Sequence, residues 1–394
     1  MKLRRAPLED WMRDFYFDTS IDLGSSGVQC WTLAEVRRLL DISHDDLDAL
    51  AFDDSPSYGS PALRTALARR FGDGDPERVM ATHGSTEAIF LVMNALLSPE
   101  DEVVVIDPGY HSLWSIAESI GCRLKRWRLR PEDGFVPDLD ALRALITPRT
   151  RMVVVNLPNN PTGATLRADQ FDAFVSLVAD SGAYLVWDGA FSELTHGAPP
   201  LPDPVLHYER CLSLGTMSKA YGLPGTRVGW CLGAPELLAR FLPLRDALTI
   251  CLSPLTEYVA ERAVVHADRL LAARGPQTAR NLRRLTTWAE AHADLVSFTP
   301  PGGGCTAFPA FPGVSDTEEL CRELGSTYDV LLVPGSGFGH PDRVRLGFGG
   351  AEAEFAEGLD RLGRALESHA RTRQTPASSS EVTSTRTREG ALVR

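Results

Sequence analysis

Short apolar runs that alternate with helix-like stretches most restrict the fold that this chain can adopt. Four runs rich in β-branched and aliphatic residues carry the signal: 103–107 (VVVID), 152–156 (MVVVN), 184–188 (YLVWD) and 211–214 (CLSL). Their apolar residues do not alternate with polar ones, which is typical of strands that helices cover on both faces of a parallel sheet. Residues 168–181 have a helical pattern, and Gly182 follows as a stop signal. The alternation predicts an α/β fold with a mostly parallel sheet covered by helices.

Polar residues end three of these runs. Asp107, Asn156 and Asp188 each take the last position of a predicted strand. In an open parallel sheet the carboxyl ends of the strands line the ligand crevice. We therefore expect these three side chains near a binding site.

The pattern changes along the chain and predicts two folded parts. Residues 51–284 contain the predicted sheet and are expected to form a large domain, in which residues 257–284 have the pattern of one long helix. Residues 285–370 are expected to form a smaller α+β domain, to which residues 1–50 contribute an N-terminal arm. Residues 371–394 are polar and poor in apolar side chains, which predicts a disordered tail.

Charge and cysteine usage exclude several classes of function. The formal net charge of −12 disfavours binding to nucleic acid or to an anionic membrane, because both require a basic protein surface. No run of about 18 apolar residues is present, and the basic N-terminus lacks the apolar core of a secretory signal. The seven cysteines include no C-x-x-C pair, so no metal site is expected, and the thiols predict a reducing, cytoplasmic environment.

The segment with the strongest chemical signal is 213–230, SLGTMSKAYGLPGTRVGW. A predicted strand ends there in a bend rich in hydroxyl groups and glycine, and Lys219 lies in this bend. Burial of such a lysine lowers its pKa and makes the amine a nucleophile toward an aldehyde. Thr216 and Ser218 flank it as donors to a phosphate, and Arg227 adds a guanidinium that can bind phosphate with two nitrogens.

Residues 83–89, HGSTEAI, place a second phosphate-binding pattern at a predicted helix start. Gly84, Ser85 and Thr86 offer backbone N–H groups, two hydroxyls and the positive end of a helix dipole to a dianion. The same residues also fit an ordinary helix N-cap with Glu87 in the first turn. The neighbouring motifs favour the phosphate.

Three further side chains lie in loops that follow predicted strands. Asn160 belongs to NNPTG, a rigid turn that can aim its amide at a ligand and that is also an ordinary loop sequence. Tyr110 follows the strand at 103–107 and can stack on an aromatic ring. Trp114 lies four residues later, on the same face as Tyr110 if a helix follows, although a place in the apolar core also explains it.

Taken in order, these motifs resemble the fold-type I enzymes that use pyridoxal 5′-phosphate (PLP), the aspartate aminotransferase superfamily, from about residue 20 to residue 365. The resemblance implies that Lys219 forms a Schiff base with PLP and that Asp188 contacts the pyridine nitrogen, whose protonation makes the ring an electron sink. It also implies that Asn160 contacts the 3′-oxygen and that Tyr110 stacks on the ring. The phosphate would be held by Gly84, Ser85, Thr86, Thr216, Ser218 and Arg227.

The family also implies a dimer and an amino-acid site. Tyr58, ahead of a Gly-x-x-x-Leu-Arg segment, would reach the phosphate of a partner subunit, so we expect a homodimer with shared active sites. Arg345 in RVRLGFG would bind the α-carboxylate of the substrate, with Arg343 as the adjacent alternative. Gly27 in LGSSG would let the amino-acid substrate approach.

One position departs from the family pattern. Phe191 stands three residues after Asp188, where the family usually has a tyrosine that is hydrogen-bonded to the 3′-oxygen of PLP. Loss of that hydroxyl removes a group that stabilises the phenolate and should alter the pKa of the lysine–PLP linkage. The departure disfavours simple transamination.

The N-terminal block 8–31, LEDWMRDFYFDTSIDLGSSGVQCW, resembles one branch of the family that acts in antibiotic biosynthesis. The resemblance implies elimination of the β-hydroxyl group from (2S,3S)-3-hydroxyarginine, followed by addition of its guanidine at Cβ to close a six-membered ring. A carboxylate and an aromatic face suit a guanidinium. Glu9 and Trp114 are the candidates, with Asp10 and Asp14 as rivals to Glu9, and a surface charge is the other explanation of Glu9.

Three other functions remain open from the sequence. An aminotransferase for a basic or aromatic amino acid with 2-oxoglutarate would use the same PLP contacts. A β-lyase would release ammonia and a keto acid. A ligand-binding module without turnover would keep the fold, although the intact Lys219 disfavours it.

Overall fold

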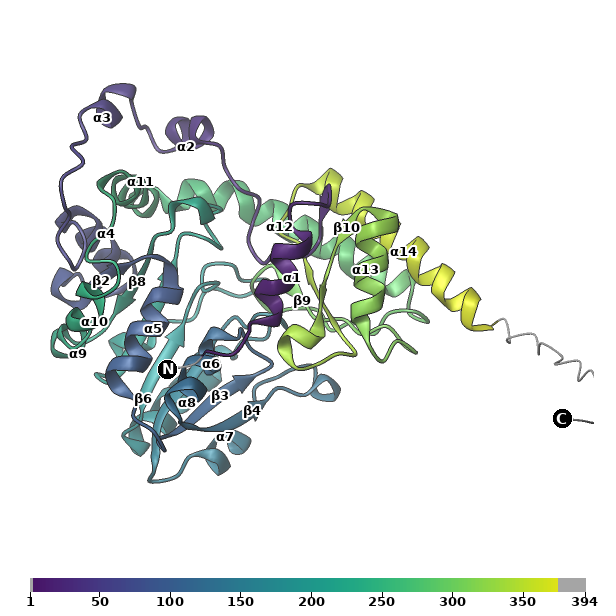
Figure 1. Cartoon of the computed structure of the whole chain (residues 1–394), viewed down its shortest axis with the longest axis horizontal. Helices are drawn as coiled ribbons and strands as arrows, with labels where there is room; N and C mark the ends of the chain where they lie inside the picture. Colours follow the sequence, from purple (N-terminus) through teal and green to yellow (C-terminus); the bar gives the residue numbers. More distant parts are fainter. Residues whose placement is uncertain (1–2, 375–394) are drawn as a thin grey trace, which may run out of the picture.

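The structure is a computed structural model that describes residues 3–374 (Figure 1). Its largest sheet has the strand order β2-β8-β7-β6-β5-β3-β4. These strands are β2 (Val79–Thr82), β3 (Glu102–Asp107), β4 (Arg123–Arg128), β5 (Thr150–Asn156), β6 (Tyr184–Asp188), β7 (Cys211–Thr216) and β8 (Gly229–Leu232). β8 is antiparallel to both of its neighbours, and the other neighbouring pairs are parallel. The predicted α/β fold with a mostly parallel sheet is confirmed.

Alternate residues of the central strands enter two separate apolar cores, which explains why their sequences are continuously apolar. Val104 and Val153 belong to one core, and their chain neighbours Val103 and Val154 belong to the other. The first core includes side chains of α4 (Pro61–Phe71), α7 (Leu139–Leu145) and α8 (Ala168–Ser181). The second includes side chains of α5 (Gly84–Leu96), α6 (Ser112–Ile120) and α9 (Pro235–Ala239), and α10 (Leu242–Asp246) packs against it. Helices therefore cover both faces of the sheet.

Local signals fix some elements more strongly than others. α8 coincides with the helix predicted for residues 168–181, and Gly182 ends it in the left-handed conformation at φ 71°. The sequence does not predict β4, because this edge strand reads RLKRWR and buries only Trp127 fully. Pairing with β3 holds β4 in the sheet despite its polar sequence.

A second, smaller part of the structure contains segments from the N-terminal and the C-terminal regions of the chain. β9 (Thr306–Ala307), β11 (Val333–Pro334) and β12 (Val344–Gly347) form a small sheet in the order β11-β12-β9. α13 (Thr317–Tyr328) packs against β10 (Val330–Leu331) and β11. β1 (Ile21–Asp22) pairs in parallel with β10, so the N-terminal arm joins the C-terminal part. The domain boundaries at residues 50, 284 and 370 stay a prediction.

Two helices replace the single long helix predicted for residues 257–284. α11 (Pro254–Val265) ends at His266, and α12 (Ala267–Ala291) begins there, because His266 leaves the helical conformation at φ −110° and ψ 25°. α11 packs on α4, whereas α12 packs on α14 (Glu352–Gln374). The break lets consecutive helices follow two different parts of the molecule. The prediction of one helix was wrong because the spacing of apolar residues in the sequence does not reveal a single residue with a non-helical backbone.

The last described helix, α14, extends into the segment that the sequence predicts to be a disordered tail. It continues to Gln374 and so includes residues 371–374 of that segment. Residues 375–394 lie outside the described residues.

The N-terminal arm places a helix at the junction of the two parts (Figure 1). α1 (Pro7–Phe15) buries Leu8 and Trp11. Trp11 Nε1 donates a hydrogen bond to Leu332 O at 2.8 Å, which attaches the helix to the C-terminal part. α2 (Leu33–Leu39) and α3 (His44–Asp48) complete the arm.

Short 3-10 helices occupy Pro76–Arg78, Pro131–Asp133, Pro204–Leu206, Pro224–Thr226 and Gly335–Phe338. Across residues 3–374, none of the helices combines the length and the apolar character that a bilayer crossing requires. The same residues contain no group of three or more His, Cys, Asp or Glu side chains suited to a metal ion.

Candidate active site

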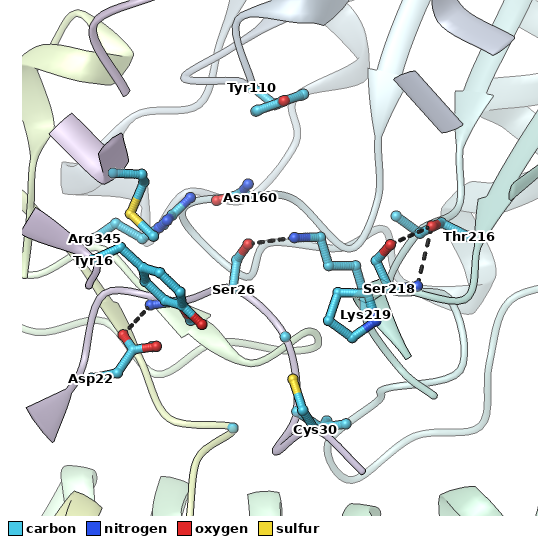
Figure 2. Close-up of a pocket in the computed structure, with 18 of the residues that line it drawn as sticks. Tyr16, Asp22, Ser26, Cys30, Tyr110, Asn160, Thr216, Ser218, Lys219 and Arg345 are labelled. Atoms are coloured by element: carbon cyan, nitrogen blue, oxygen red, sulfur yellow. Dashed lines mark hydrogen bonds between the residues drawn. The ribbon is translucent and has the colours of Figure 1, made fainter. Parts of the chain in front are cut away.

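A cavity of about 740 Å³ lies where the carboxyl ends of β5, β6 and β7 face α1 and the C-terminal part. Figure 2 shows side chains from these different elements pointing into the same space. The predicted site residues that line it are Glu9, Gly27, Ser85, Thr86, Tyr110, Asn160, Asp188, Thr216, Ser218, Lys219, Arg227 and Arg345. Residues far apart in the sequence thus meet in one place.

Hydroxyl groups gather in one region of the cavity. Ser85 and Thr86 lie in the first turn of α5, and Thr216 and Ser218 lie at and just after the end of β7. Thr216 Oγ1 donates to Ser218 Oγ at 3.0 Å and accepts from Ser218 N at 3.2 Å, which keeps these side chains together (Figure 2). Arg227 Nη1 donates to Ser218 Oγ at 3.4 Å. Hydroxyls and a guanidinium at a helix N-terminus suit a phosphate dianion.

Gly84 makes room for Arg227 because it has no side chain. It does not line the cavity, but it has φ 73°, and a Cβ at this position would lie 2.7 Å from Arg227 Nη2. At Gly229, a Cβ would lie 2.5 Å from Ser85 N. The two glycines therefore allow the guanidinium and the first N–H groups of α5 to share one anion site.

Two buried polar side chains have fewer partners than burial usually requires. Burial of Asp188, at the end of β6, raises the pKa of its carboxyl group to about 6, although Ala190 N donates to Oδ1 at 3.0 Å. Asn160 Oδ1 is buried and has no hydrogen-bond partner within residues 3–374. Because buried polar groups are normally hydrogen-bonded, both side chains indicate a polar ligand in the cavity.

Replacing Asp188 with asparagine should stabilise the cofactor-free protein at pH 8. The carboxyl pKa is about 6 in the folded chain and about 4 in an unfolded chain, so the cost of ionising the buried group grows between these values as pH rises. The cost reaches about 2–3 kcal/mol above pH 6 and disappears in the amide. Denaturant titrations should give a clearly larger stability gain at pH 8 than near pH 4.5, and an equal gain at both would contradict this assignment.

Lys219 lies in the cavity, three residues after β7. Burial, together with the nearby Arg345 guanidinium, lowers the pKa of its amine to about 8. Its Nζ donates a hydrogen bond to Ser26 Oγ at 2.8 Å (Figure 2). An amine with this pKa is partly neutral near physiological pH and can serve as a nucleophile or a base.

Arg345, on β12, provides a buried cation beside Lys219. Its Nε and Nη2 donate to Gly24 O at 3.1 and 2.7 Å, which leaves Nη1 without an acceptor in the described part of the chain. Arg343, the alternative, donates from Nη1 to Phe308 O at 3.0 Å and does not line the cavity. The geometry therefore favours Arg345 as the carboxylate-binding residue.

α1 brings the carboxylate of Glu9 to the same cavity. Tyr110 Oη donates to Glu9 Oε1 at 2.9 Å. Burial and the Glu9 charge together raise the pKa of the Tyr110 phenol. The Glu9 charge also acts to raise the pKa values of Lys219 and Arg345, which shows that it is electrostatically part of this site.

The two acidic rivals of Glu9 lie outside the cavity. Asp10 Oδ2 accepts from Arg5 Nε at 2.8 Å, and its Oδ1 pairs with Arg13. Asp14 is exposed to solvent. Neither lines the cavity, so α1 presents Glu9 alone of the three acids to the site.

Besides Gly84, two further predicted site residues do not line the cavity of their own chain. Trp114 was expected on the same helical face as Tyr110, but α6 begins at Ser112, so Tyr110 precedes the helix and the four-residue spacing does not apply. Arg126 Cζ lies 4.6 Å from the centroid of the Trp114 ring instead. Tyr58 also lies outside the cavity, and a single chain does not test a role for it across a dimer.

Several cavity residues carry no sequence signal that singles them out. They are Met12, Tyr16, Asp22, Ser25, Ser26, Cys30 and Glu354. Asp22 Oδ1 accepts from Gly24 N and Ser25 N at 2.8 Å each, which shapes the loop that carries Ser26 (Figure 2). Ser26 could have been noticed through its place next to Gly27 in LGSSG.

The donor set of the cavity fits PLP. The hydroxyls, the α5 N-terminus and Arg227 suit its phosphate, and the buried Asp188 carboxyl suits a protonated pyridine nitrogen. The unpartnered Asn160 amide suits the 3′-oxygen, and the Lys219 amine suits the aldehyde.

Comparison with known proteins agrees with this fit. Residues 29–362 match the aminotransferase class I and II family. The chain is 47% identical to capreomycidine synthase of Streptomyces vinaceus over 94% of this chain and 96% of that protein. It is 28% identical to aspartate/prephenate aminotransferase of Thermus thermophilus over 79% of this chain and 83% of that protein.

Solved structures show the same relationship. The PLP-dependent cyclase OrfR is 44% identical and superposes with a TM-score of 0.89 over 94% of this chain and 98% of its own. A PLP-dependent aminotransferase from Streptococcus suis is 29% identical, with a TM-score of 0.88 over 93% and 99% of the two chains. The fold-type I architecture predicted from the motifs is confirmed. This chain therefore belongs to the class I and II aminotransferase family, whose members use PLP as their cofactor.

Proposed function

We propose that this enzyme forms capreomycidine from (2S,3S)-3-hydroxyarginine by β-elimination of the hydroxyl group and closure of the guanidine onto Cβ. The observation that carries the proposal is the position of Glu9 in the same cavity as Lys219 and Arg345. Such a cavity offers an anion to a guanidinium, a cation to an α-carboxylate and an amine that can act as a base. The similarity to a capreomycidine synthase and to a PLP-dependent cyclase supports it.

Bound PLP supplies an electron sink for the negative charge that develops at the α-carbon. Among the residues of this chain, Asp188 would keep the ring nitrogen protonated, and Asn160 would donate to the 3′-oxygen. Tyr110 would cover the ring face. The phosphate would be held by Ser85, Thr86, Thr216, Ser218 and Arg227, with Gly84 giving Arg227 room.

Three side chains act on the substrate in this proposal. Arg345 binds the α-carboxylate through Nη1. Lys219 takes the proton from Cα, because a pKa of about 8 leaves a useful neutral fraction of its amine near physiological pH. Glu9 holds the guanidinium so that its nitrogen lies near Cβ, and this proximity supplies much of the ring-closure rate.

Phe191 distinguishes this site from that of a typical aminotransferase. Its ring centroid lies 6.0 Å from Lys219 Nζ, and the ring offers no hydroxyl to a ligand beside the lysine. The side chain is buried, so water does not readily take the place of the missing hydroxyl. This difference favours the cyclase over transamination.

The product formed without a keto acid tests the proposal. Purified enzyme, PLP and 3-hydroxyarginine should yield a product that has lost one water and kept every nitrogen, with a cyclic guanidine in its NMR spectrum. Turnover that requires 2-oxoglutarate and forms glutamate would refute the cyclase and leave an aminotransferase. Release of ammonia would instead indicate a β-lyase.

We also propose that the enzyme is a homodimer in which Tyr58 reaches the phosphate site of the partner subunit. Tyr58 lies outside the cavity of its own chain. The apolar side chains of Phe52 and Ile250 are 79% and 57% exposed. Cys251 Sγ lies 3.9 Å from Asp54 Oδ1, so these two exposed segments are neighbours. An exposed apolar surface on the segment that leads to Tyr58 supports an interface there.

Mixed dimers provide a test of shared active sites. Chains that carry Lys219→Ala and chains that carry Tyr58→Ala should each be nearly inactive. If each site combines Lys219 of one subunit with Tyr58 of the other, random reassociation should restore about a quarter of the wild-type activity. Reassociated dimers with no more activity than the parent variants would contradict the shared site.

We also propose a cytoplasmic location, which the state of the cysteines supports. All seven are free, and Cys211, Cys231, Cys305 and Cys321 are buried. Unpaired buried thiols are typical of proteins in a reducing compartment.

A further inference from the structure

Ser26 is in direct contact with the amine of Lys219. Lys219 Nζ donates to Ser26 Oγ at 2.8 Å, although 193 residues separate the two in the sequence (Figure 2). Ser26 is 6% exposed and lines the cavity. The contact therefore places a second proton-carrying group beside the base that we assign to the α-proton.

The backbone around Ser26 is held independently of its hydroxyl group. Val28 N donates to Lys219 O at 3.2 Å, and Cys305 Sγ donates to Ser26 O at 3.2 Å. Gly27 lets the segment pass close to the backbone that carries the lysine, because a Cβ at Gly27 would lie 3.1 Å from Ser218 O. The Ser26 side chain is thus kept against Lys219 by bonds that a change in the hydroxyl does not remove.

The hydroxyl of Ser26 can accept a proton from Lys219 and donate its own proton into the cavity. It accepts from Lys219, and its own proton has no acceptor among the residues that the structure describes. A hydroxyl accepts and donates at the same time. With Lys219 on one side and the cavity on the other, the Ser26 proton is free to point at a substrate atom.

Loss of the β-hydroxyl requires such a proton, because hydroxide leaves poorly unless it is protonated as it departs. The neighbouring phenol is a poor source. Tyr110 Oη already donates to Glu9, and burial and Glu9 raise the pKa of its phenol. Phe191 has no proton to give. Ser26 is left as the hydroxyl in contact with the base.

We infer that Ser26 is a further catalytic residue, which relays the proton from Lys219 to the departing β-hydroxyl oxygen; the inference rests on the proposed elimination. The Cα–H bond breaks, and its proton goes to Lys219 Nζ. A Lys219 proton then moves to Ser26 Oγ while the Ser26 proton moves to the leaving oxygen. The Cβ–O bond breaks with its electron pair on oxygen, water leaves, and the Cα–H pair forms the Cα=Cβ bond. Lys219 and Ser26 regain their starting states, and no oxidant is needed.

The test separates proton removal from elimination in the PLP-loaded enzyme. The substrate is 3-hydroxyarginine with deuterium at Cα, and both the loss of label from recovered substrate and the formation of cyclic product are measured. In Ser26→Ala, label loss should stay within about threefold of wild type, whereas product formation should fall about 100-fold, the scale of general acid catalysis. Ser26→Thr keeps a hydroxyl and should recover most of the product rate.

A better leaving group provides the decisive control. With the 3-chloro analogue, chloride leaves without a proton, so Ser26→Ala should react within about threefold of wild type. Ser20→Ala removes the same atom from an exposed serine of the same segment that does not line the cavity, and it should leave the ratio of label loss to product formation unchanged. Equal slowing of label loss and product formation in Ser26→Ala, or no slowing of either, would overturn the relay.

A measurement without turnover completes the test. A hydrogen bond to the ammonium form favours that form, so the cofactor-free Ser26→Ala protein should capture PLP with a midpoint at lower pH than wild type. An unshifted midpoint would show that the contact with Lys219 is absent in solution and would overturn the inference. If wild-type enzyme loses no water from 3-hydroxyarginine at all, the proposed function fails first, and that outcome is visible before any variant is compared.

Discussion

Replacing Lys219 with alanine should abolish both the covalent attachment of PLP and turnover. The amine lies in the cavity beside Ser26 and Arg345, and among residues 3–374 no second lysine lines the cavity to take its place. Loss of a positioned base alone lowers kcat by about 100- to 10,000-fold, and loss of the covalent link adds to this. Borohydride reduction followed by mass spectrometry should find PLP fixed to the wild-type chain and absent from the variant.

The small number of lysines makes it simple to assign the residue that PLP labels. The chain contains three, at positions 2, 125 and 219. Lys125 Nζ lies on β4, 2.6 Å from Glu102 Oε2, and does not line the cavity. Lys125→Arg keeps the charge and is the matched control, and it should retain wild-type labelling. PLP fixed to the Lys219→Ala chain in equal amount would contradict the assignment.

The pH dependence of PLP capture gives a second readout of the same residue. Burial and Arg345 lower the pKa of Lys219 to about 8, and only the neutral amine attacks an aldehyde. The capture rate of the cofactor-free protein should therefore rise about tenfold per pH unit below pH 8 and level off above it. A rate that keeps rising to pH 10 would indicate a solvated lysine.

The sequence predicts most of the sheet and of the PLP site because both depend on local patterns. β6 coincides with the predicted run at 184–188, and Asp188 lies at the end of this strand as expected. The Lys219 bend and the start of α5 are contiguous motifs whose meeting point follows from the topology of a parallel sheet. The sequence alone therefore indicates the chemistry of these two segments.

The parts that the sequence did not predict depend on contacts between distant segments. β1 and β10 pair through two residues each, which is too short for a recognisable pattern, and yet this pairing helps to position the segment that carries Ser26. Trp114 was misplaced because the start of α6 at Ser112 depends on the loop before it. A local pattern gives the type of an element more reliably than the residue at which it begins.

Replacing Glu9 with glutamine should lower kcat/KM for 3-hydroxyarginine by about 30- to 1,000-fold, which corresponds to 2–4 kcal/mol for a desolvated charge pair that loses one charge. The amide oxygen still accepts from Tyr110, so the contact that orients the side chain is kept. Removal of the negative charge leaves the substrate guanidinium without its partner in the cavity. The loss should therefore depend on the charge of the ligand.

A charged and a neutral ligand together measure the effect of the Glu9 charge on binding. The inhibition constants of arginine and of citrulline, which has a neutral urea in place of the guanidinium, are measured for wild type and for Glu9→Gln. The variant should bind arginine at least about 30-fold more weakly and bind citrulline within about threefold of wild type. Asp14→Asn changes an exposed acid on the same helix and should alter neither constant. Equal losses for both ligands would mean that Glu9 supports the shape of the cavity and does not bind the guanidinium.

The same variant should also change the titration of Lys219. The Glu9 charge acts to raise the pKa of this amine against the larger effect of burial, so its removal lowers the pKa further below 8. PLP capture by cofactor-free Glu9→Gln should then reach its plateau at lower pH than in wild type, whereas Asp14→Asn should leave the profile in place. A shift in capture together with selective loss of arginine binding would connect Glu9 to both ends of the reaction, the base at Cα and the guanidine that closes the ring.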